Sequence, residues 1–161
     1  MISDPLLNDY GSTRPVVLLG RAFSGKYEVS VVSVKISEAM CEKLESYGIS
    51  PIDLGAKFLF REPSVMWFEA CLRELLFTSN LRRLRRRKLA FDECKLLSFT
   101  CIVSVPADIA YGLGVVSLPL KAAVSELPLS YRLAGNALRP LASYIDRKLI
   151  IGMTNSARIV V

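Results

Sequence analysis

The stretch that most constrains the fold is YEVSVVSVKI, residues 27–36, because its valines and alternating pattern indicate a β-strand. Side chains at every second position of a strand lie on one face of the sheet. Two apolar sets of different phase follow each other here: Tyr27, Val29 and Val31, and then Val32, Val34 and Ile36. We expect a bulge or a sharp twist near residues 31–32, which would keep both sets in a single core.

Other local patterns indicate further elements. RPVVLLG predicts a strand over 16–19, and Ser37 is placed to cap a helix over 37–47 that Gly48 ends. The residues 95–105, KLLSFTCIVSV, alternate as a strand, and residues 149–161, LIIGMTNSARIVV, are typical of a closing hairpin. An amphipathic helix is predicted from residue 64, with short strands over 56–60 and 115–120.

These elements predict an α+β fold: a single compact domain with an antiparallel sheet, two or three packed helices and a C-terminal hairpin. We expect the domain to cover residues 16–161. Residues 1–15 contain two prolines, a glycine and an Asn-Asp pair, which predicts a flexible N-terminal arm. Within it Pro5, Leu6 and Leu7 form an apolar hook that could dock on a second copy of the chain.

The segment LRRLRRRKL, residues 81–89, holds the whole net charge of the chain. The sequence has 21 bases and 15 acids, a formal charge of +6, and this segment contributes six bases: Arg82, Arg83, Arg85, Arg86, Arg87 and Lys88. Without them the rest of the chain is neutral. Such a patch predicts a partner of dense negative charge, and three are open: nucleic-acid phosphates, anionic lipid headgroups or a nuclear import receptor. A solvated surface without a partner is the plainer interpretation.

The chain contains no histidine, which removes the commonest general base and metal ligand of enzymes. Its four cysteines include no CxxC pair and lie in apolar contexts typical of reduced core residues. We therefore expect a protein that is not an enzyme, with no catalytic residue, no metal and no cofactor. The apolar fraction of 52% is high, and no apolar run reaches the about 20 residues of a membrane span, so self-association or a peripheral membrane surface is favoured. The N-terminus also lacks the pattern of a signal peptide.

The segment GRAFSGK, residues 20–26, matches the GxxxxGK spacing of a phosphate-binding loop. Tyr27 stands where that loop needs a hydroxyl for magnesium, and a strand pattern follows where it needs a helix. We predict a hairpin turn without nucleotide. Arg21, Phe23 and Lys26 then form a possible membrane-contacting loop, an aromatic side chain between two bases.

The pattern of the chain resembles the matrix proteins of rhabdoviruses. The likeness lies in FEACLRELLFTSNLRR (68–83), an amphipathic helix followed by a Ser-Asn turn and bases, and in the strand, helix and closing hairpin already described. Matrix proteins of bornavirus type are a neighbouring possibility. The chain departs from the family because it has no PPxY or PTAP motif and no lysine-rich arm.

The resemblance implies a non-enzymatic structural protein beneath a viral envelope, in the host cytoplasm and the virion. It would form homo-oligomers and bridge the ribonucleoprotein and the inner membrane leaflet through the basic patch. Two alternatives stay open: a small RNA-binding regulator such as a viral silencing suppressor, and a degenerate nucleotide-binding enzyme built on residues 20–26.

Overall fold

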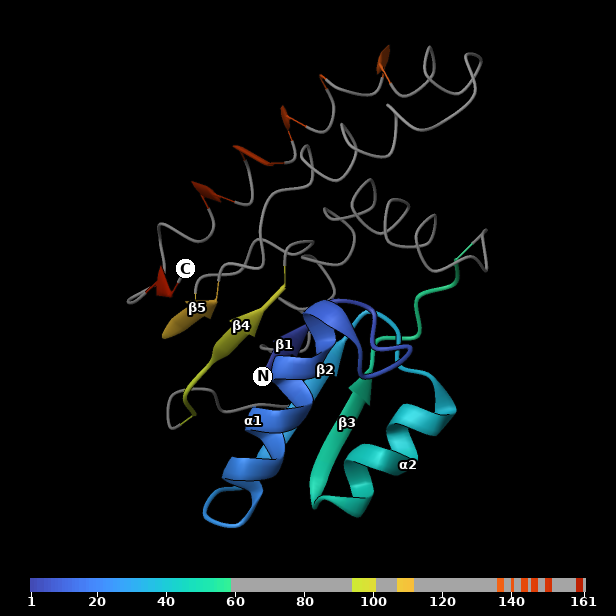
Figure 1. Cartoon of the computed structure of the whole chain (residues 1–161), viewed down its shortest axis with the longest axis vertical. Coiled ribbons are helices and arrows are strands. Elements are labelled where there is room, and N and C mark those ends of the chain that lie inside the picture. Colours follow the sequence, from blue (N-terminus) through green and yellow to red (C-terminus); the bar gives the residue numbers. More distant parts are fainter. Residues whose placement is uncertain are drawn as a thin grey trace.

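The computed structural model describes residues 1–58, 94–100, 107–111, 136–137, 140, 143–144, 146–147, 150–151 and 159–160. In these residues six strands form one sheet in the order β3-β2-β1-β4-β5-β6 (Figure 1). The strands are β1 (Ile2–Ser3), β2 (Val29–Ser33), β3 (Ile49–Asp53), β4 (Leu97–Phe99), β5 (Ile109–Tyr111) and β6 (Ile159–Val160). Every pairing between these strands is parallel. The expected antiparallel α+β fold is therefore wrong, and the protein has an α/β fold of Rossmann-like arrangement.

The parallel sheet explains the two apolar phases of residues 27–36. Val29 and Val31 belong to a core cluster with residues of both helices, whereas the buried Val32 and Val34 lie outside that cluster and, by alternation, on the other face. The pairing of β2 with β3 runs through Val29–Ser33 without an interruption. The expected bulge is absent from this strand, because a parallel strand buries both faces and reads as a nearly continuous apolar run.

The helix α1 (Arg14–Ser24) occupies the place of the strand expected over 16–19. Pro15 stands in its first turn, where the missing N–H costs no helix hydrogen bond. Its buried residues are Val16, Val17 and Gly20. Their spacing is helical, but the sequence does not reveal it because residues 16–19 are all apolar. A Cβ at Gly20 would lie 2.8 Å from Ile49 Cδ1, so glycine lets α1 approach β3 closely.

The helix α2 (Glu38–Ser46) confirms the sequence prediction for residues 37–47. The Ser37 side chain accepts a hydrogen bond of 3.3 Å from the backbone N–H of Met40. Met40 and Leu44 are buried, and Gly48 follows the helix with a φ of +72°, a conformation that glycine adopts without strain. Figure 1 shows α1 and α2 on the same face of the sheet, where the core cluster lies.

Residues 1–15 do not form an arm apart from the domain. They contain β1, which pairs with β2 on one side and β4 on the other, and the 3-10 helix η1 (Gly11–Thr13) that leads into α1. Leu6 is fully buried and forms an isolated parallel bridge with Ile36. Its N–H donates to the carbonyl of Lys35 at 2.8 Å, so the chain after β1 extends the pairing with β2.

The C-terminal prediction is also corrected. Ile150 and Ile151 are helical, and β6 pairs in parallel with β5, so residues 149–161 do not form a hairpin. The strand expected over 95–105 is confirmed at β4, and its residues after 100 lie outside the described part. The described residues 56–58 of the expected strand 56–60 are irregular. The predicted helix from residue 64 and the strand over 115–120 lie outside the described residues.

Candidate ligand site at the carboxyl edge of the sheet

The strand order reverses direction between β1 and β4. From β1 the chain moves outward through β2 to β3, and β4 then pairs on the opposite side of β1. In open parallel sheets, ligands bind in the crevice outside the carboxyl ends of the strands at such a switch point. The residues that follow β1 and β4 are therefore the first candidates for a site.

A buried hydrogen bond joins those two strand ends. Thr100 follows β4, and its Oγ1 donates to Oδ1 of Asp4, which follows β1, at 2.5 Å. Both side chains are buried, with 4% and 2% of their surface exposed. The Ser33 hydroxyl at the end of β2 donates to the backbone carbonyl of Asp4 at 2.8 Å. The carboxyl ends of three adjacent strands are thereby linked, which gives the switch point a fixed shape.

The loop from Asp4 to α1 is held by its own side chains. The hydroxyl of Thr13 lies 2.7 Å from the carbonyl of Asn8 and 2.8 Å from the carbonyl of Tyr10, within hydrogen-bond distance of both. The Asn8 side chain accepts from the backbone N–H of Tyr10 at 3.3 Å. Gly11 has a φ of +56°, and nothing lies within 4 Å of the position of a Cβ there. The backbone at Gly11 is therefore open to approach by a ligand.

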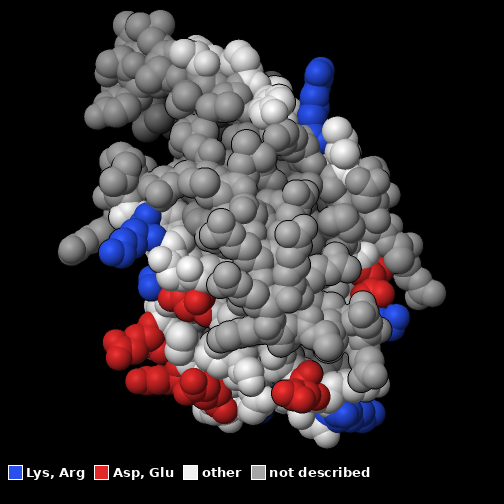
Figure 2. Space-filling model, turned by 180° about the vertical axis from the view of Figure 1, so that it is seen from behind, with Lys and Arg blue, Asp and Glu red and all other residues white. Residues whose placement is uncertain are grey.

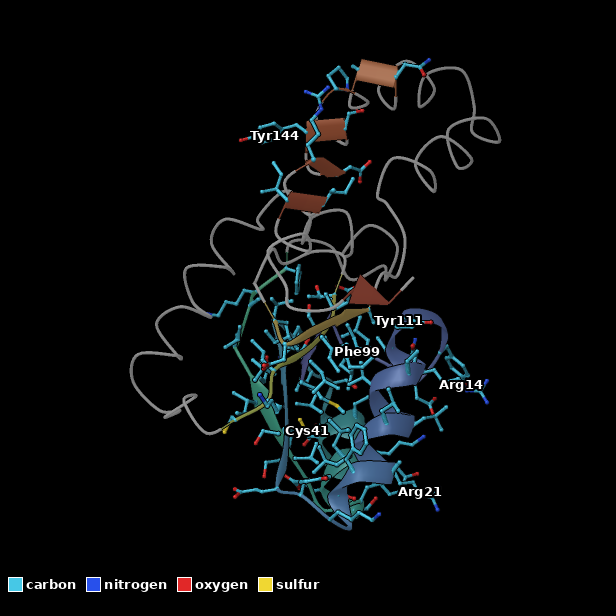
Figure 3. The ribbon with its side chains drawn as sticks, turned by 90° about the vertical axis from the view of Figure 1, so that its left-hand side faces the viewer. Arg14, Arg21, Cys41, Phe99, Tyr111 and Tyr144 are labelled. Carbon is cyan, nitrogen blue, oxygen red and sulfur yellow. The ribbon has the colours of Figure 1, made fainter. Side chains whose placement is uncertain are left out.

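The N-terminus of α1 follows directly and has no side-chain cap. Thr13 occupies the cap position but makes no cap hydrogen bond, and the first turn contains no acid. A helix N-terminus carries partial positive charge that attracts anions. In α1 this charge acts without free N–H groups at its first two residues, because the N–H of Arg14 donates to the carbonyl of Gly11 and Pro15 has none. Two exposed side chains flank it, Tyr10 on the loop and Arg14 on the first turn. Figure 3 shows Arg14 pointing away from the sheet at this end of α1.

An ion pair fixes the outer side of the loop. Lys43 of α2 contacts Asp9 at 2.6 Å. The pKa of Asp9 is lowered chiefly by its hydrogen bond with Lys43, and the pKa of Lys43 is raised by the same bond. Both groups therefore stay charged around neutral pH, and the Asp9 carboxylate is neutralised locally. Among the described residues Arg14 forms no ion pair within 4 Å, although its charge also helps to lower the pKa of Asp9.

The features of a dinucleotide site are missing from this edge. That site uses a G-x-G-x-x-G turn after β1 and an acid near the end of β2 for the ribose. The segment between β1 and α1 contains one glycine, Gly11. Lys35 follows β2 instead of an acid, and it forms an ion pair of 2.9 Å with Asp53 at the end of β3. NAD does not fit this arrangement.

The sequence-predicted membrane loop lies at the other end of α1. Arg21 and Lys26 are exposed, and the Arg21 guanidinium lies 5.1 Å from the ring centroid of Tyr47. Phe23 is half-buried against the core cluster and meets Tyr27 edge-to-face at 6.3 Å. Residues 20–24 form the end of α1, and the turn after them leads into β2, so the order of helix and strand is the reverse of that around a phosphate-binding loop. This supports the prediction that they bind no nucleotide, although the turn joins α1 to a parallel strand and is no hairpin.

Two further predicted sites remain, the self-association segment of residues 5–7 and the basic patch of residues 82–88. Leu6 is buried within its own chain, and the carbonyl of Leu7 accepts from the Ser37 hydroxyl at 3.0 Å, so the hook of Pro5, Leu6 and Leu7 contacts the domain itself. The basic patch, residues 82–88, lies outside the described residues.

Sequence reasoning missed Asp4, Tyr10, Arg14 and Thr100 as a group. One signal was present in the sequence. A polar loop with a glycine, residues 8–13, is followed by Pro15 and an apolar run, and this order is typical of a turn that leads from a strand into a helix. The strand before it has two residues, too few for a periodic pattern. Thr100 could not be joined to Asp4 without the sheet order.

Among the described residues, no cluster of three or more Cys, Asp or Glu side chains is placed to hold a metal ion. In the same part of the chain, no helix is long and apolar enough to span a membrane. Comparisons with protein-family models, with curated proteins and with solved structures found no match for this chain.

Proposed function

We propose that the protein binds a phosphorylated small molecule of the nucleotide class at the carboxyl edge between β1 and β4. The observation that carries this proposal is the reversal of strand order at β1, with the loop of residues 4–13 and the uncapped N-terminus of α1 beside it. The fold supports this place as the site of binding, and the side chains around it support the proposed chemistry of the ligand.

Phosphate is the group that best suits the start of α1. The partial positive charge at the start of α1, the open backbone at Gly11 and the guanidinium of Arg14 all favour an anion. The exposed ring of Tyr10 beside them offers a flat surface on which a base can stack. A nucleotide has both groups, whereas inorganic phosphate has only one of them and a simple sugar has neither.

Within the nucleotide class we take nucleotide-activated sugars as the first substrates to test. NAD is disfavoured by the missing glycines and by Lys35 after β2. The exposed amide of Asn8 lies on the same loop and suits sugar hydroxyls. In glycosyl transfer, negative charge develops on the leaving diphosphate, and Arg14 with the helix N-terminus would stabilise that charge. The proposed activity is thus transfer of a sugar from a nucleoside diphosphate sugar, with the nucleoside diphosphate as the leaving group, an assignment by fold analogy and site chemistry.

This proposal replaces the expectation of a matrix-like structural protein. One support for that expectation, the antiparallel α+β layout, is contradicted by the parallel sheet, and the matrix-like role itself stays a prediction. The helix and bases that carried the rest of the resemblance lie outside the described residues. The basic patch of residues 82–88 remains a candidate contact for RNA or lipid phosphates, as a separate surface.

Calorimetry with UDP, ADP, GDP and their sugar conjugates, with NAD as the comparison, tests the proposal. We expect one nucleotide series to bind and NAD not to bind. Arg14→Ala should weaken binding about tenfold, as expected for loss of one charge-assisted contact. Arg21→Ala is the matched control, since it removes the same exposed side chain from the other end of α1. Equal affinity of both variants, or no binding by any nucleotide, would contradict the proposed site.

A further inference from the structure

The outward face of α1 is unusual for a helix at a protein surface. Its buried residues are Val16, Val17 and Gly20, yet its exposed side carries Leu18, Leu19 and Ala22 between Arg14 and Arg21. Leu18 is 56% exposed and Leu19 37% exposed. Surface helices normally place polar residues there, and large apolar side chains exposed side by side indicate an interaction surface. The described structure covers the inner side alone.

The charged side chains of residues 10–27, which include α1, are all basic. Residues 10–27 contain the bases Arg14, Arg21 and Lys26 and no acid. Figure 3 shows Arg14 and Arg21 directed away from the sheet along α1. The neighbouring helix α2 has the opposite character, with the exposed acids Glu38, Glu42 and Glu45. Figure 2 shows acidic side chains gathered at the corner of the molecule where α2 lies. The apolar and basic surface is therefore confined to α1 and its two ends.

Aromatic side chains stand at both ends of that surface. Tyr10 is 74% exposed just before α1, and Tyr27 is 66% exposed just after it. A tyrosine ring with an apolar body and a polar tip suits the boundary between lipid tails and headgroups. The 11 residues of α1 extend about 16 Å at the rise of an α-helix, enough to lie flat on a bilayer.

We infer that the outward face of α1 docks on an anionic lipid surface, with Leu18 and Leu19 in the acyl boundary and the three bases at the headgroups. Charge complementarity selects this occupant. A second copy placed face to face would bring the arginines of two α1 helices together, and these like charges would repel. Anionic headgroups meet the same bases favourably, and the two leucines gain an apolar environment. This inference shares Tyr10 and Arg14 with the proposed nucleotide site, but it is tested at Leu18, which lies outside that site.

Sedimentation of the full chain with vesicles tests the inference. The vesicles are phosphatidylcholine alone and phosphatidylcholine mixed with phosphatidylglycerol, and soluble glycerol phosphate is the competitor. We expect binding to the anionic vesicles, weak binding to the neutral ones and no competition by the soluble phosphate. Leu18→Asp should lower the partition coefficient by at least about tenfold, because a leucine leaves the acyl boundary and a repelled charge enters.

Ala39→Asp is the matched control, since it adds the same charge on the exposed surface of α2. Ala39→Asp should lower the partition coefficient less than about twofold. Both variants keep the basic patch of residues 82–88, so the difference between their partition coefficients measures the contribution of α1. Leu18→Ser serves the same purpose if the aspartate variant fails to fold by circular dichroism. Equal loss in the two variants, competition by soluble glycerol phosphate, or a smaller sedimentation coefficient of Leu18→Asp without lipid would overturn the inference.

Discussion

Asp4 and Thr100 are 96 residues apart in the sequence and share a buried hydrogen bond of 2.5 Å. Each residue comes directly after a strand, and the two strands are neighbours at the point where the sheet order reverses. The bond therefore ties β1, the first strand of the chain, to β4. It also shapes the edge at which we propose that a ligand binds.

Removing the hydroxyl of Thr100 should destabilise the fold. Thr100→Val keeps the volume of the side chain but leaves a buried carboxylate oxygen of Asp4 without this donor. We expect the free energy of unfolding to fall by about 1–3 kcal/mol in urea titrations. Thr100→Ser keeps the hydroxyl and should cost less than half as much. Equal losses would show that the methyl group, and not the hydrogen bond, contributes the stability.

Gly11 and Gly25 provide a matched pair of glycine positions. Neither has an atom within 4 Å of a built Cβ, so a methyl group fits at both. Gly11 has a φ of +56° and Gly25 a φ of −72°. Gly11→Ala should lower the free energy of unfolding by about 1 kcal/mol, because a left-handed backbone strains any residue with a Cβ. Gly25→Ala should raise it by about 0.4–1 kcal/mol through the entropy of the unfolded chain. Thermal unfolding of both variants measures these changes. Equal loss of stability in the two variants would contradict the assignment of the effect to the left-handed backbone at Gly11.

Gly20 and Ile49 should be energetically coupled. A methyl group at Gly20 would lie 2.8 Å from Ile49 Cδ1, which must shift to make room. In an isolated helix Gly20→Ala would raise the stability by about 1 kcal/mol through helix propensity, and here this gain should be reduced or lost. Ile49→Val removes that atom at a cost of about 0.5–1.5 kcal/mol. The double variant should be at least about 0.5 kcal/mol more stable than the sum of the single changes predicts. Additivity would refute the close approach of α1 to β3, and Gly25→Ala with Ile49→Val is the additive control.

The α-amino group of Met1 should control stability between pH 6 and 8. Burial lowers the pKa of this amine from 8.0 to about 6, and the amine donates to the carbonyl of Ser30 at 2.6 Å. In that window the unfolded chain binds more protons than the folded one, so stability rises as the pH rises from 6 to 8. A shift of two pKa units corresponds to about 2–3 kcal/mol over the full titration. The chain has no histidine, the side chain that ordinarily titrates in this window.

Urea unfolding at several pH values, with the α-amino group free or acetylated, measures this effect. The free-amine chain should gain stability toward pH 8, and the acetylated chain should show a flat profile. An identical rise in both forms would assign the dependence to another group.

Local patterns in the sequence were sufficient for α2 and for part of β4. The Ser37 cap, the spacing of Met40 and Leu44 and the stop at Gly48 all lie within about a dozen residues, and a helix hydrogen-bonds only within itself. The alternation of Leu97 and Phe99 likewise marks a strand whatever its partner is.

Tertiary structure alone decided the direction of strand pairing and the composition of the site. The valines of β2 suit a bulged antiparallel strand as well as a parallel strand buried on both faces, and only the neighbours of β2 distinguish these. The run Val16–Leu19 suits a strand or a helix, and its packing on β3 through Gly20 selects the helix. Asp4 and Thr100 meet because β1 lies between β2 and β4. Strand order is a property of contacts between distant segments, which the pattern within any one segment does not contain.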